Sequence, residues 1–235
     1  MHSLGDVLGI WAHPDDETYL SAAVMMRAMN TGHRVMCVTA TRGEQGSTDP
    51  ARWPPGPPLA RVRTRESAEA MRIIGVREHH WLDYPDGGLR DVDAHEAVHR
   101  IGDLVGTWRP DTIVTFAPTG MTGHPDHQTV SAWARAVAAA LQPQPEVLHA
   151  VHAQSLMDRH LTRLLELDIF MNDALPDTAP DDQAITLRLT DAEMGAKWAA
   201  LRAQPSQTEA LFATAGDTLM RDMFSEESFI RAGPT

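Results

Sequence analysis

The chain has 235 residues, which suits one enlarged domain and would be cramped for two. Hydrophobic residues make up 43% and charged residues 22%, so the composition is that of a globular protein with a sizeable core and excludes a wholly disordered chain. Lys and Arg total 20 against 32 Asp and Glu, a formal net charge of −12 at pH 7. Because this charge repels phosphates, we expect neither a nucleic acid nor an anionic membrane as partner.

The cysteine count and the hydropathy pattern bear on the compartment. A single cysteine, Cys37, lies in an apolar run, so no intrachain disulfide can form. No uninterrupted apolar stretch approaches ~18 residues, and the first residues lack the basic and apolar regions of a signal peptide. We expect a soluble, cytoplasmic protein; the sequence leaves its oligomeric state open, a homo-oligomer included.

Up to about residue 150, short apolar runs alternate with longer segments of helical periodicity, which is the pattern of βαβ units. The pattern predicts strands over 7–12, 35–41, 79–82, 112–116 and 147–151, and helices over 16–30, 59–74, 94–108 and 126–141. Between residues 41 and 59 the chain is too rich in Gly and Pro for regular structure. We predict an α/β fold, a Rossmann-like, doubly wound, mostly parallel sheet with helices on both faces.

The remainder reads as a C-terminal α+β extension. Residues 161–171 have helical periodicity, 174–183 form a Pro- and Asp-rich connector, and 185–189 alternate like a strand. The segment Thr190-Asp-Ala-Glu193 fits a capping box that opens a helix ending near residue 203. We therefore predict one domain over 1–235, with a core at 1–150 and an extension at 151–235 that contributes to the pocket.

The strongest chemical signal is the segment His13-Pro-Asp-Asp-Glu17, directly after the first predicted strand. Side chains at this place point into the crevice at the carboxyl edge of a parallel sheet, where open α/β folds bind their ligands. His13 and Asp16 lie three residues apart across the turn and could offer a nitrogen and an oxygen to one metal ion. Asp15 would then stay free.

A second signal, Gly123-His-Pro-Asp-His127, follows the fourth predicted strand. In a sheet of order 3-2-1-4-5, strands one and four are neighbours at the switch point, so the two motifs should converge. A third ligand from this segment would complete a His, Asp, His set around zinc and leave one position for water. Such an open site is hydrolytic rather than structural.

The two His-Pro-Asp motifs resemble those of the LmbE-like or PIG-L family of zinc-dependent deacetylases, which remove an N-acetyl or related N-acyl group, commonly from N-acetylglucosamine conjugates. Weaker family features run along most of the chain, at 41–44, 63–66, 84–88, 206–207 and 229. The resemblance implies that three side chains bind one zinc per chain, with Fe²⁺ as a further candidate metal. These ligands are His13, Asp16 and His127.

The resemblance also implies catalytic roles. Asp15 would be the general base, His124 would stabilise the tetrahedral oxyanion and protonate the leaving amine, and Asp126 would orient and charge-tune His124. Arg63 corresponds to a substrate contact of the family. Glu44 and Asp86 follow strands two and three, so we expect them to touch the substrate or to support the site.

The expected activity is therefore removal of an N-acetyl group from a small-molecule, N-acylated amino sugar by metal-activated water. An amidase that cleaves a larger N-acyl group or a thiol-conjugate amide with the same metal site is the main alternative. Two other classes are disfavoured. His95-Glu-Ala-Val-His99 matches the His-Glu-x-x-His protease pattern but lacks a third ligand, since Val105 holds that position. A non-catalytic nucleotide-binding module would require a glycine-rich phosphate loop that the sequence lacks.

Overall fold

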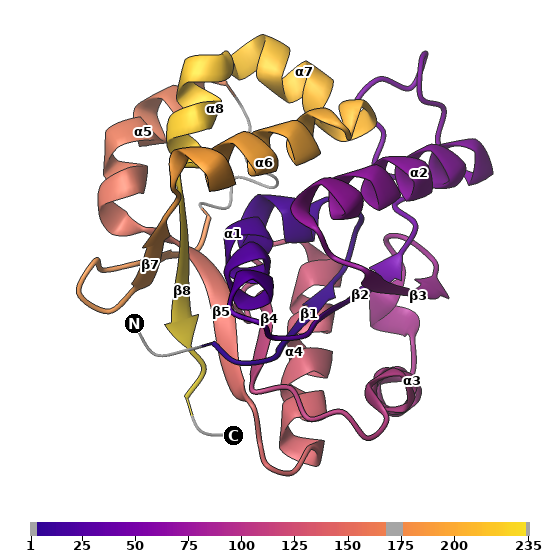
Figure 1. Cartoon of the computed structure of the whole chain (residues 1–235). Coiled ribbons are helices and arrows are strands. Elements are labelled where there is room, and N and C mark those ends of the chain that lie inside the picture. Colours follow the sequence, from indigo (N-terminus) through magenta and orange to yellow (C-terminus); the bar gives the residue numbers. More distant parts are fainter. Residues whose placement is uncertain (1–3, 168–175, 234–235) are drawn as a thin grey trace.

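The computed structural model describes residues 4–167 and 176–233. Its strands are β1 (Val7–Trp11), β2 (Val35–Thr41), β3 (Glu78–Tyr84), β4 (Thr112–Phe116), β5 (Glu146–Ala153), β6 (Thr178–Ala179), β7 (Ile185–Arg188) and β8 (Glu226–Arg231). Seven of them follow the order β3-β2-β1-β4-β5-β8-β7, and β6 pairs with β5 (Figure 1). The strands β1, β2, β3, β4 and β5 pair in parallel, whereas β8 is antiparallel to β5 and to β7.

Helices cover both faces of the sheet. They are α1 (Asp16–Asn30), α2 (Pro57–Ile74), α3 (Ala94–Val105), α4 (Pro125–Ala140), α5 (Gln154–Glu166), α6 (Asp191–Arg202), α7 (Pro205–Ala215) and α8 (Asp217–Met223), with a 3₁₀ turn at Leu89–Asp91. The helices α1, α2 and α6 pack together on one face, and α3 packs with α4 on the other (Figure 1). None of the helices within the described ranges is both long and apolar enough to cross a membrane.

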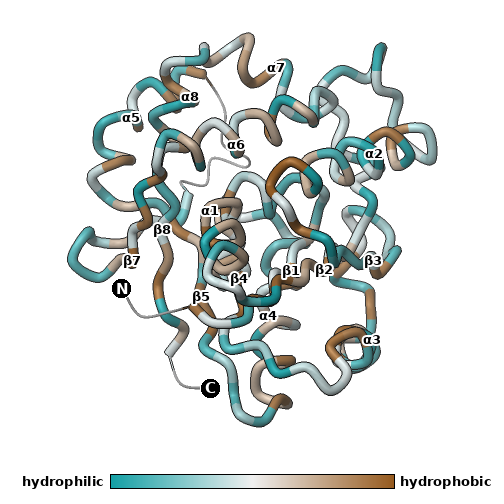
Figure 2. Tube along the Cα trace, in the orientation of Figure 1, coloured by the Kyte–Doolittle hydropathy of each residue, from teal (hydrophilic) through white to brown (hydrophobic). Residues whose placement is uncertain are grey.

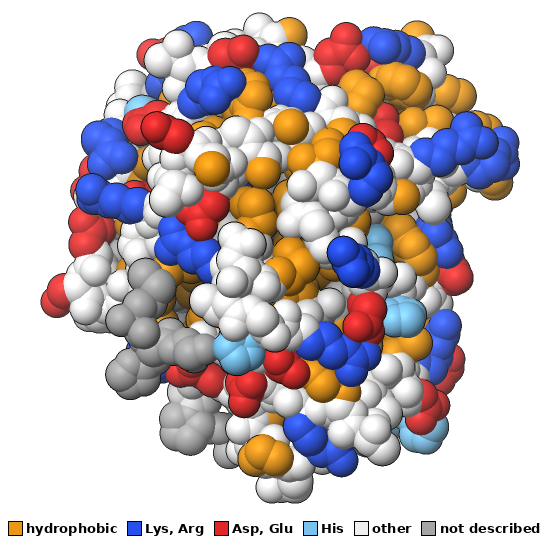
Figure 3. Space-filling view, in the orientation of Figure 1, with side chains coloured by type: hydrophobic (Ala, Val, Ile, Leu, Met, Phe, Trp, Pro, Cys, Tyr) orange, Lys and Arg blue, Asp and Glu red, His pale blue; other side chains and the backbone are white. Residues whose placement is uncertain are grey.

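The central strands are buried on both sides, which explains their near-continuous apolar sequences. Every residue of β1, β2 and β4 is buried. Figure 2 shows hydrophobic residues, drawn in brown, along the central strands and on parts of the helices. On the face drawn in Figure 3, acidic and basic side chains are interspersed. In the register, Val7 of β1 is opposite both Val35 of β2 and Thr112 of β4. The carboxyl ends of β1 and β4 therefore lie side by side.

The predicted Rossmann-like architecture is confirmed, and β2, β4 and α1 have the predicted bounds. The helix predicted over 94–108 ends at Val105, because Gly106 follows with φ of +56° and its N–H caps the carbonyl of Gly102. The predicted start at residue 161 was wrong, since α5 begins directly after β5 and buries Leu156 and Met157 in its first turn. Residues 168–171 of that prediction and 174–175 of the predicted connector lie outside the described residues.

The sequence did not predict α7, α8 or β8. Strand β8 opens with two glutamates, which do not read as a buried strand, and α7 and α8 are short. The predicted capping box is confirmed, because the Thr190 hydroxyl accepts from the Glu193 N–H while the Glu193 carboxylate accepts from the Thr190 N–H.

A buried ion pair ties β8 to the helices above it. Lys197 of α6 is 0% exposed and its Nζ lies 2.8 Å from Glu227 Oε1 on β8. The same carboxylate accepts the main-chain N–H groups of Ala23 and Val24 in α1, at 2.9 and 3.1 Å. One side chain of β8 therefore joins α1, α6 and the sheet.

We predict that Lys197→Met destabilises the protein by about 3–5 kcal/mol, because it leaves the Glu227 charge buried without its partner. Urea unfolding followed by circular dichroism measures the change. Arg72→Met removes an exposed pair with Glu69 on α2 and should leave the midpoint unchanged. Equal midpoints for both variants would contradict the structural role given to the buried pair.

Candidate metal and catalytic site

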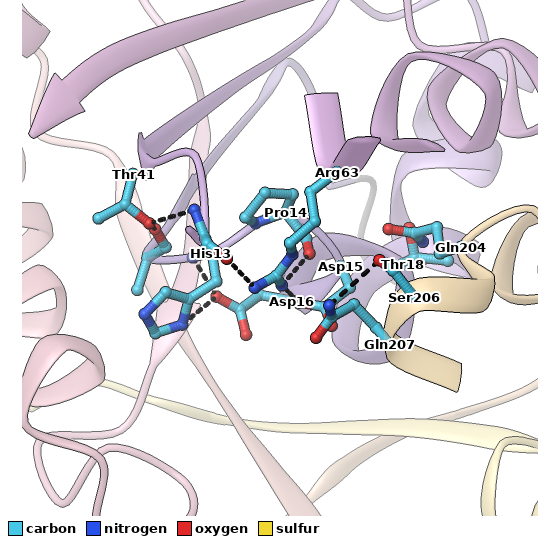
Figure 4. Close-up of polar contacts among 12 residues, drawn as sticks. His13, Pro14, Asp15, Asp16, Thr18, Thr41, Arg63, Gln204, Ser206 and Gln207 are labelled. Carbon is cyan, nitrogen blue, oxygen red and sulfur yellow. Dashed lines mark hydrogen bonds and ion pairs between the residues drawn. The ribbon is translucent and has the colours of Figure 1, made fainter. Parts of the chain in front are cut away.

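The turn between β1 and α1 is held in an unusual backbone conformation. Asp15 has φ of +124°, a region that costs a residue with a side chain on the order of 1–3 kcal/mol. Arg63 of α2 stabilises this conformation, since its Nη2 donates to the carbonyl of Pro14 at 2.7 Å and to Asp15 Oδ1 at 3.2 Å (Figure 4). The main-chain N–H of His13 donates to Asp16 Oδ2 at 2.7 Å across the same turn.

Arg63 is 3% exposed and reaches a third segment as well. Its Nη1 donates to the carbonyl of Gly43 at 2.9 Å, just beyond β2. A Cβ at Gly43 would collide with the guanidinium, so the close approach requires glycine at this position. The guanidinium thus fixes the turn after β1 against the loop after β2.

The three predicted metal ligands converge. His13 Nδ1 lies 3.1 Å from His127 Nε2, while the two carboxylate oxygens of Asp16 lie 3.7 Å from His13 Nδ1 and 3.5 Å from His127 Nε2. A tetrahedral zinc ion with bonds of ~2.0–2.2 Å requires ligand atoms about 3.4 Å apart. His13 and Asp16 are each 8% exposed, so little water competes for these atoms. These donors fit a zinc ion in kind, with the two nitrogens 3.1 Å apart and one oxygen of the Asp16 carboxylate near each nitrogen.

His13 Nε2 and His127 Nδ1 each have a polar partner in the protein. His13 Nδ1 and His127 Nε2 are therefore the nitrogens available to a metal ion. His127 Nδ1–H donates to the carbonyl of Gly120 at 3.0 Å, and the His127 ring stacks on Phe116 with centroids 4.0 Å apart. His13 Nε2 faces Asp86 Oδ1 at 3.1 Å and Asp126 Oδ2 at 3.4 Å. Such partners fix the orientation of a metal-binding imidazole and raise its basicity.

The cluster carries a surplus of acidic groups, which shows in the protonation equilibria. Burial lowers the pKa of His13, but hydrogen bonds to Asp126 and Asp86 outweigh burial and raise it to about 10. Burial raises the pKa of Asp15 to about 7, although Arg63 opposes this shift. A divalent cation at the donor set would displace a proton from His13 and lower the pKa of Asp15 again, since positive charge favours the carboxylate.

His124 and Asp126 stand at the start of α4. His124 is the N-cap, where its Nδ1 accepts the main-chain N–H of Asp126 at 3.1 Å, and its ring centroid lies 4.8 Å from those of His13 and His127. The Asp126 carboxylate is fully buried and accepts the N–H groups of Gly87 and Leu89, at 2.8 and 3.2 Å. In the neutral imidazole of His124, Nε2 therefore carries the proton.

The predicted substrate contacts form a network behind His13. Asp86 Oδ2 accepts the N–H of Gln45 at 2.8 Å, and Glu44 Oε1 accepts the N–H of Asp86 at 2.9 Å. Sequence reasoning placed Asp86 near the site but did not identify its contact with His13. It also missed Gly120 and Phe116, which the sequence does not mark, because a main-chain carbonyl and a strand phenylalanine have no distinctive pattern.

The disfavoured protease motif lies elsewhere. His95 and His99 are exposed on α3, and His99 Nδ1 pairs with Asp103 Oδ2 at 3.0 Å. Ile101 and Val105 of the same helix are buried against the sheet, as the apolar stripe predicts. The motif is therefore a surface feature of a packed helix.

The chain is similar in sequence to known deacetylases. Residues 8–138 match the PIG-L family model, described as GlcNAc-PI de-N-acetylase. A 1D-myo-inositol 2-acetamido-2-deoxy-alpha-D-glucopyranoside deacetylase from Mycolicibacterium smegmatis is 32% identical over 88% of this chain and 81% of its own length. The enzyme of the same name from Kineococcus radiotolerans is 37% identical over 53% of this chain and 42% of its own.

Among solved structures, the N,N'-diacetylchitobiose deacetylase from Pyrococcus horikoshii superposes with a TM-score of 0.68 at 23% identity, over 97% of this chain and 83% of that one. This likeness shows a shared fold. The family match spans both His-Pro-Asp motifs and more than half of the chain. The chain therefore belongs to the PIG-L family of de-N-acetylases and is a hydrolase that acts on amide bonds.

Proposed function

We propose that this protein is a zinc-dependent deacetylase that removes the N-acetyl group from a small N-acetylglucosamine-type conjugate. One observation carries the proposal. His13 Nδ1 and His127 Nε2 lie 3.1 Å apart, and each lies within 3.7 Å of one carboxylate oxygen of Asp16. The carboxylate of Asp15 is adjacent in sequence but outside this set. The names of the curated relatives, which are deacetylases of an inositol-linked acetamido sugar, support the substrate class.

Two nitrogens and a carboxylate suit zinc, and also Fe²⁺. Zinc, when bound, acidifies water and polarises the carbonyl of the amide. The side chains around the donor set transfer the protons and orient the reacting groups. Asp15 accepts a proton from the attacking water, and Arg63 holds the Asp15 carboxylate in place through its 3.2 Å contact.

His124 is the group that would face the developing oxyanion. Its Nδ1 is occupied by the Asp126 N–H, so Nε2–H is left to donate, and a fixed donor at this point stabilises charge as it forms. As the C–N bond breaks, the leaving nitrogen takes up the proton that Asp15 accepted from water, while His124 Nε2–H keeps its hydrogen bond to the acyl oxygen. The products are acetate and a free amine.

The polar side chains of Glu44, Asp86 and Arg63 would recognise the sugar. These residues follow β2 and β3 or lie on α2, on one side of the donor set. In the substrate-free protein they are engaged with His13, Asp15 and neighbouring main chain. We expect hydroxyl groups of the sugar to bind at the edge of this network, and residues 151–235 to complete the pocket on the other side.

Removing a ligand should remove the metal. His13→Ala and His127→Ala each delete one of three donors, so we expect less than a tenth of the zinc content of the unaltered protein by elemental analysis. His99→Ala is the matched control, because this exposed histidine on α3 lies outside the donor set. Full zinc content in either ligand variant would contradict the assignment.

Asp15→Asn should lower kcat by ~10²–10⁴-fold while zinc stays bound, since the amide cannot accept the proton. Asparagine tolerates positive φ, so the turn should keep its conformation. Asp83→Asn is the control: Asp83 also has positive φ, +57°, but is exposed and paired with Arg42. Loss of zinc together with activity would instead identify Asp15 as a ligand.

A chelator should abolish release of primary amine from N-acetylglucosamine conjugates, and added zinc should restore it, because the carbonyl is not polarised without the ion. Metal content is measured on the same samples. Turnover that survives complete removal of the metal would refute the zinc mechanism. If Fe²⁺ restores more activity than zinc, Fe²⁺ is the metal of the enzyme and the assignment of the ligands is unchanged.

A further inference from the structure

A cavity of about 240 Å³ opens beside the donor set, on the side away from Glu44 and Asp86. Asp16 and His127 line one end of it, while Met220, Met223 and Phe224 of the α8 region line the other. The name acyl chamber is used below for this cavity. It extends from the metal ligands into the part of the protein built by β5, β8 and α8.

The far walls of the acyl chamber are apolar clusters separate from the main core. Met223 packs with Leu156, Met157 and Leu164, whereas Met220 packs with the cluster around Trp198 and Phe212. Leu20, Met121 and Val151 also line the cavity. Such a lining favours an apolar occupant, because each buried CH₂ group leaves water on binding.

Two polar groups on the wall are already paired with side chains behind it. Glu227 is paired with Lys197, and the Ser228 hydroxyl bonds the Thr186 hydroxyl at 2.9 Å. Burial lowers the pKa of His152 to about 4, so this imidazole is neutral. Glu226 Oε1 is buried and has no hydrogen-bond partner in the described part of the chain. The other oxygen of this carboxylate, Oε2, lies 4.0 Å from Arg188 Nε, so the free Oε1 disfavours an occupant that ends in a carboxylate.

The size of the acyl chamber exceeds what an acetyl group needs. Since one water molecule takes up roughly 30 Å³ in the liquid, the cavity could hold a chain of several methylenes. Its position matters too. With the scissile amide at the ligands and the sugar on the Glu44 and Asp86 side, the acyl substituent points into the acyl chamber.

We propose that the acyl chamber binds the acyl chain of the substrate, so that the enzyme hydrolyses uncharged N-acyl groups longer than acetyl. This inference rests on the proposed amide hydrolase activity and extends its substrate class. In each case the amide C–N bond breaks, the hydroxyl of water joins the acyl carbon, and the proton goes to nitrogen. The products are a fatty acid and the amine.

The first test is a series of acetyl, butanoyl, hexanoyl and octanoyl amides of one glucosamine conjugate. We expect kcat/KM to rise about fourfold for each methylene buried, up to the length that fills the cavity. A carboxylate-ended suberoyl amide should react at least tenfold more slowly than the octanoyl amide. A steady fall in kcat/KM from acetyl onward would overturn the inference.

The second test narrows the far end of the acyl chamber. Met223→Trp should lower the octanoyl to acetyl ratio of kcat/KM at least tenfold. Leu165→Trp is the control, since Leu165 is 54% exposed on α5 and should leave the ratio unchanged. Octanoate binding to the metal-free protein, measured by calorimetry, provides a readout without turnover. We expect tighter binding of octanoate than of acetate, and equal affinities would overturn the inference even if Met223→Trp fails to fold.

These outcomes separate the inference from the proposed function. Hydrolysis of the acetyl amide without a gain from longer chains would leave the deacetylase standing and remove the acyl chamber. A gain from an octyl aglycone on the N-acetyl substrate, lost in Met223→Trp, would assign the cavity to the aglycone and refute the acyl assignment. No hydrolysis of any amide by the zinc-loaded protein would overturn both.

Discussion

The site depends on the short turn after β1, in which Asp15 is held at positive φ. The conformation lets Asp16 face His13 and His127 while Asp15 stays outside the donor set. Arg63 offsets the cost of the turn by binding both the Pro14 carbonyl and the Asp15 carboxylate. Because the guanidinium also binds the Gly43 carbonyl, the ligand turn, the loop after β2 and helix α2 are positioned together.

Sheet topology then brings His127, the third predicted ligand, to this turn and divides the surroundings. Since β1 lies between β2 and β4, the turn after β1 meets the start of α4 at the carboxyl edge. The loops after β2 and β3 bring carboxylates to one side of the ligands, and β5, β8 and α8 bring apolar side chains to the other. An amide at the ligands would therefore have a polar environment for one substituent and an apolar one for the other.

Buried charges are balanced at the Glu227–Lys197 pair but not at the candidate site. At the site, Asp15, Asp16, Asp86 and Asp126 gather around His13 and Arg63, an arrangement that invites a cation. In the extension, the buried Glu227 already has Lys197 and two helix N–H groups, so its charge is balanced within the protein. The acidic groups of the first cluster are left for a cation of the kind proposed above, whereas the second cluster holds β8 against the helices.

The sequence by itself determined the alternation of strands and helices up to residue 150, the strand order and the two His-Pro-Asp motifs. These features follow from local periodicity and from the rule that parallel strands end at one edge. The tertiary structure alone decided which nitrogen of His13 and of His127 is left without a protein partner outside the cluster. Gly120, Asp86 and Asp126 reach the other nitrogens from segments distant in sequence or through the main chain. It also determined the position and lining of the acyl chamber, whose walls include residues of α1, β5, β8 and α8. A cavity is a property of packing between segments, and no local pattern encodes it.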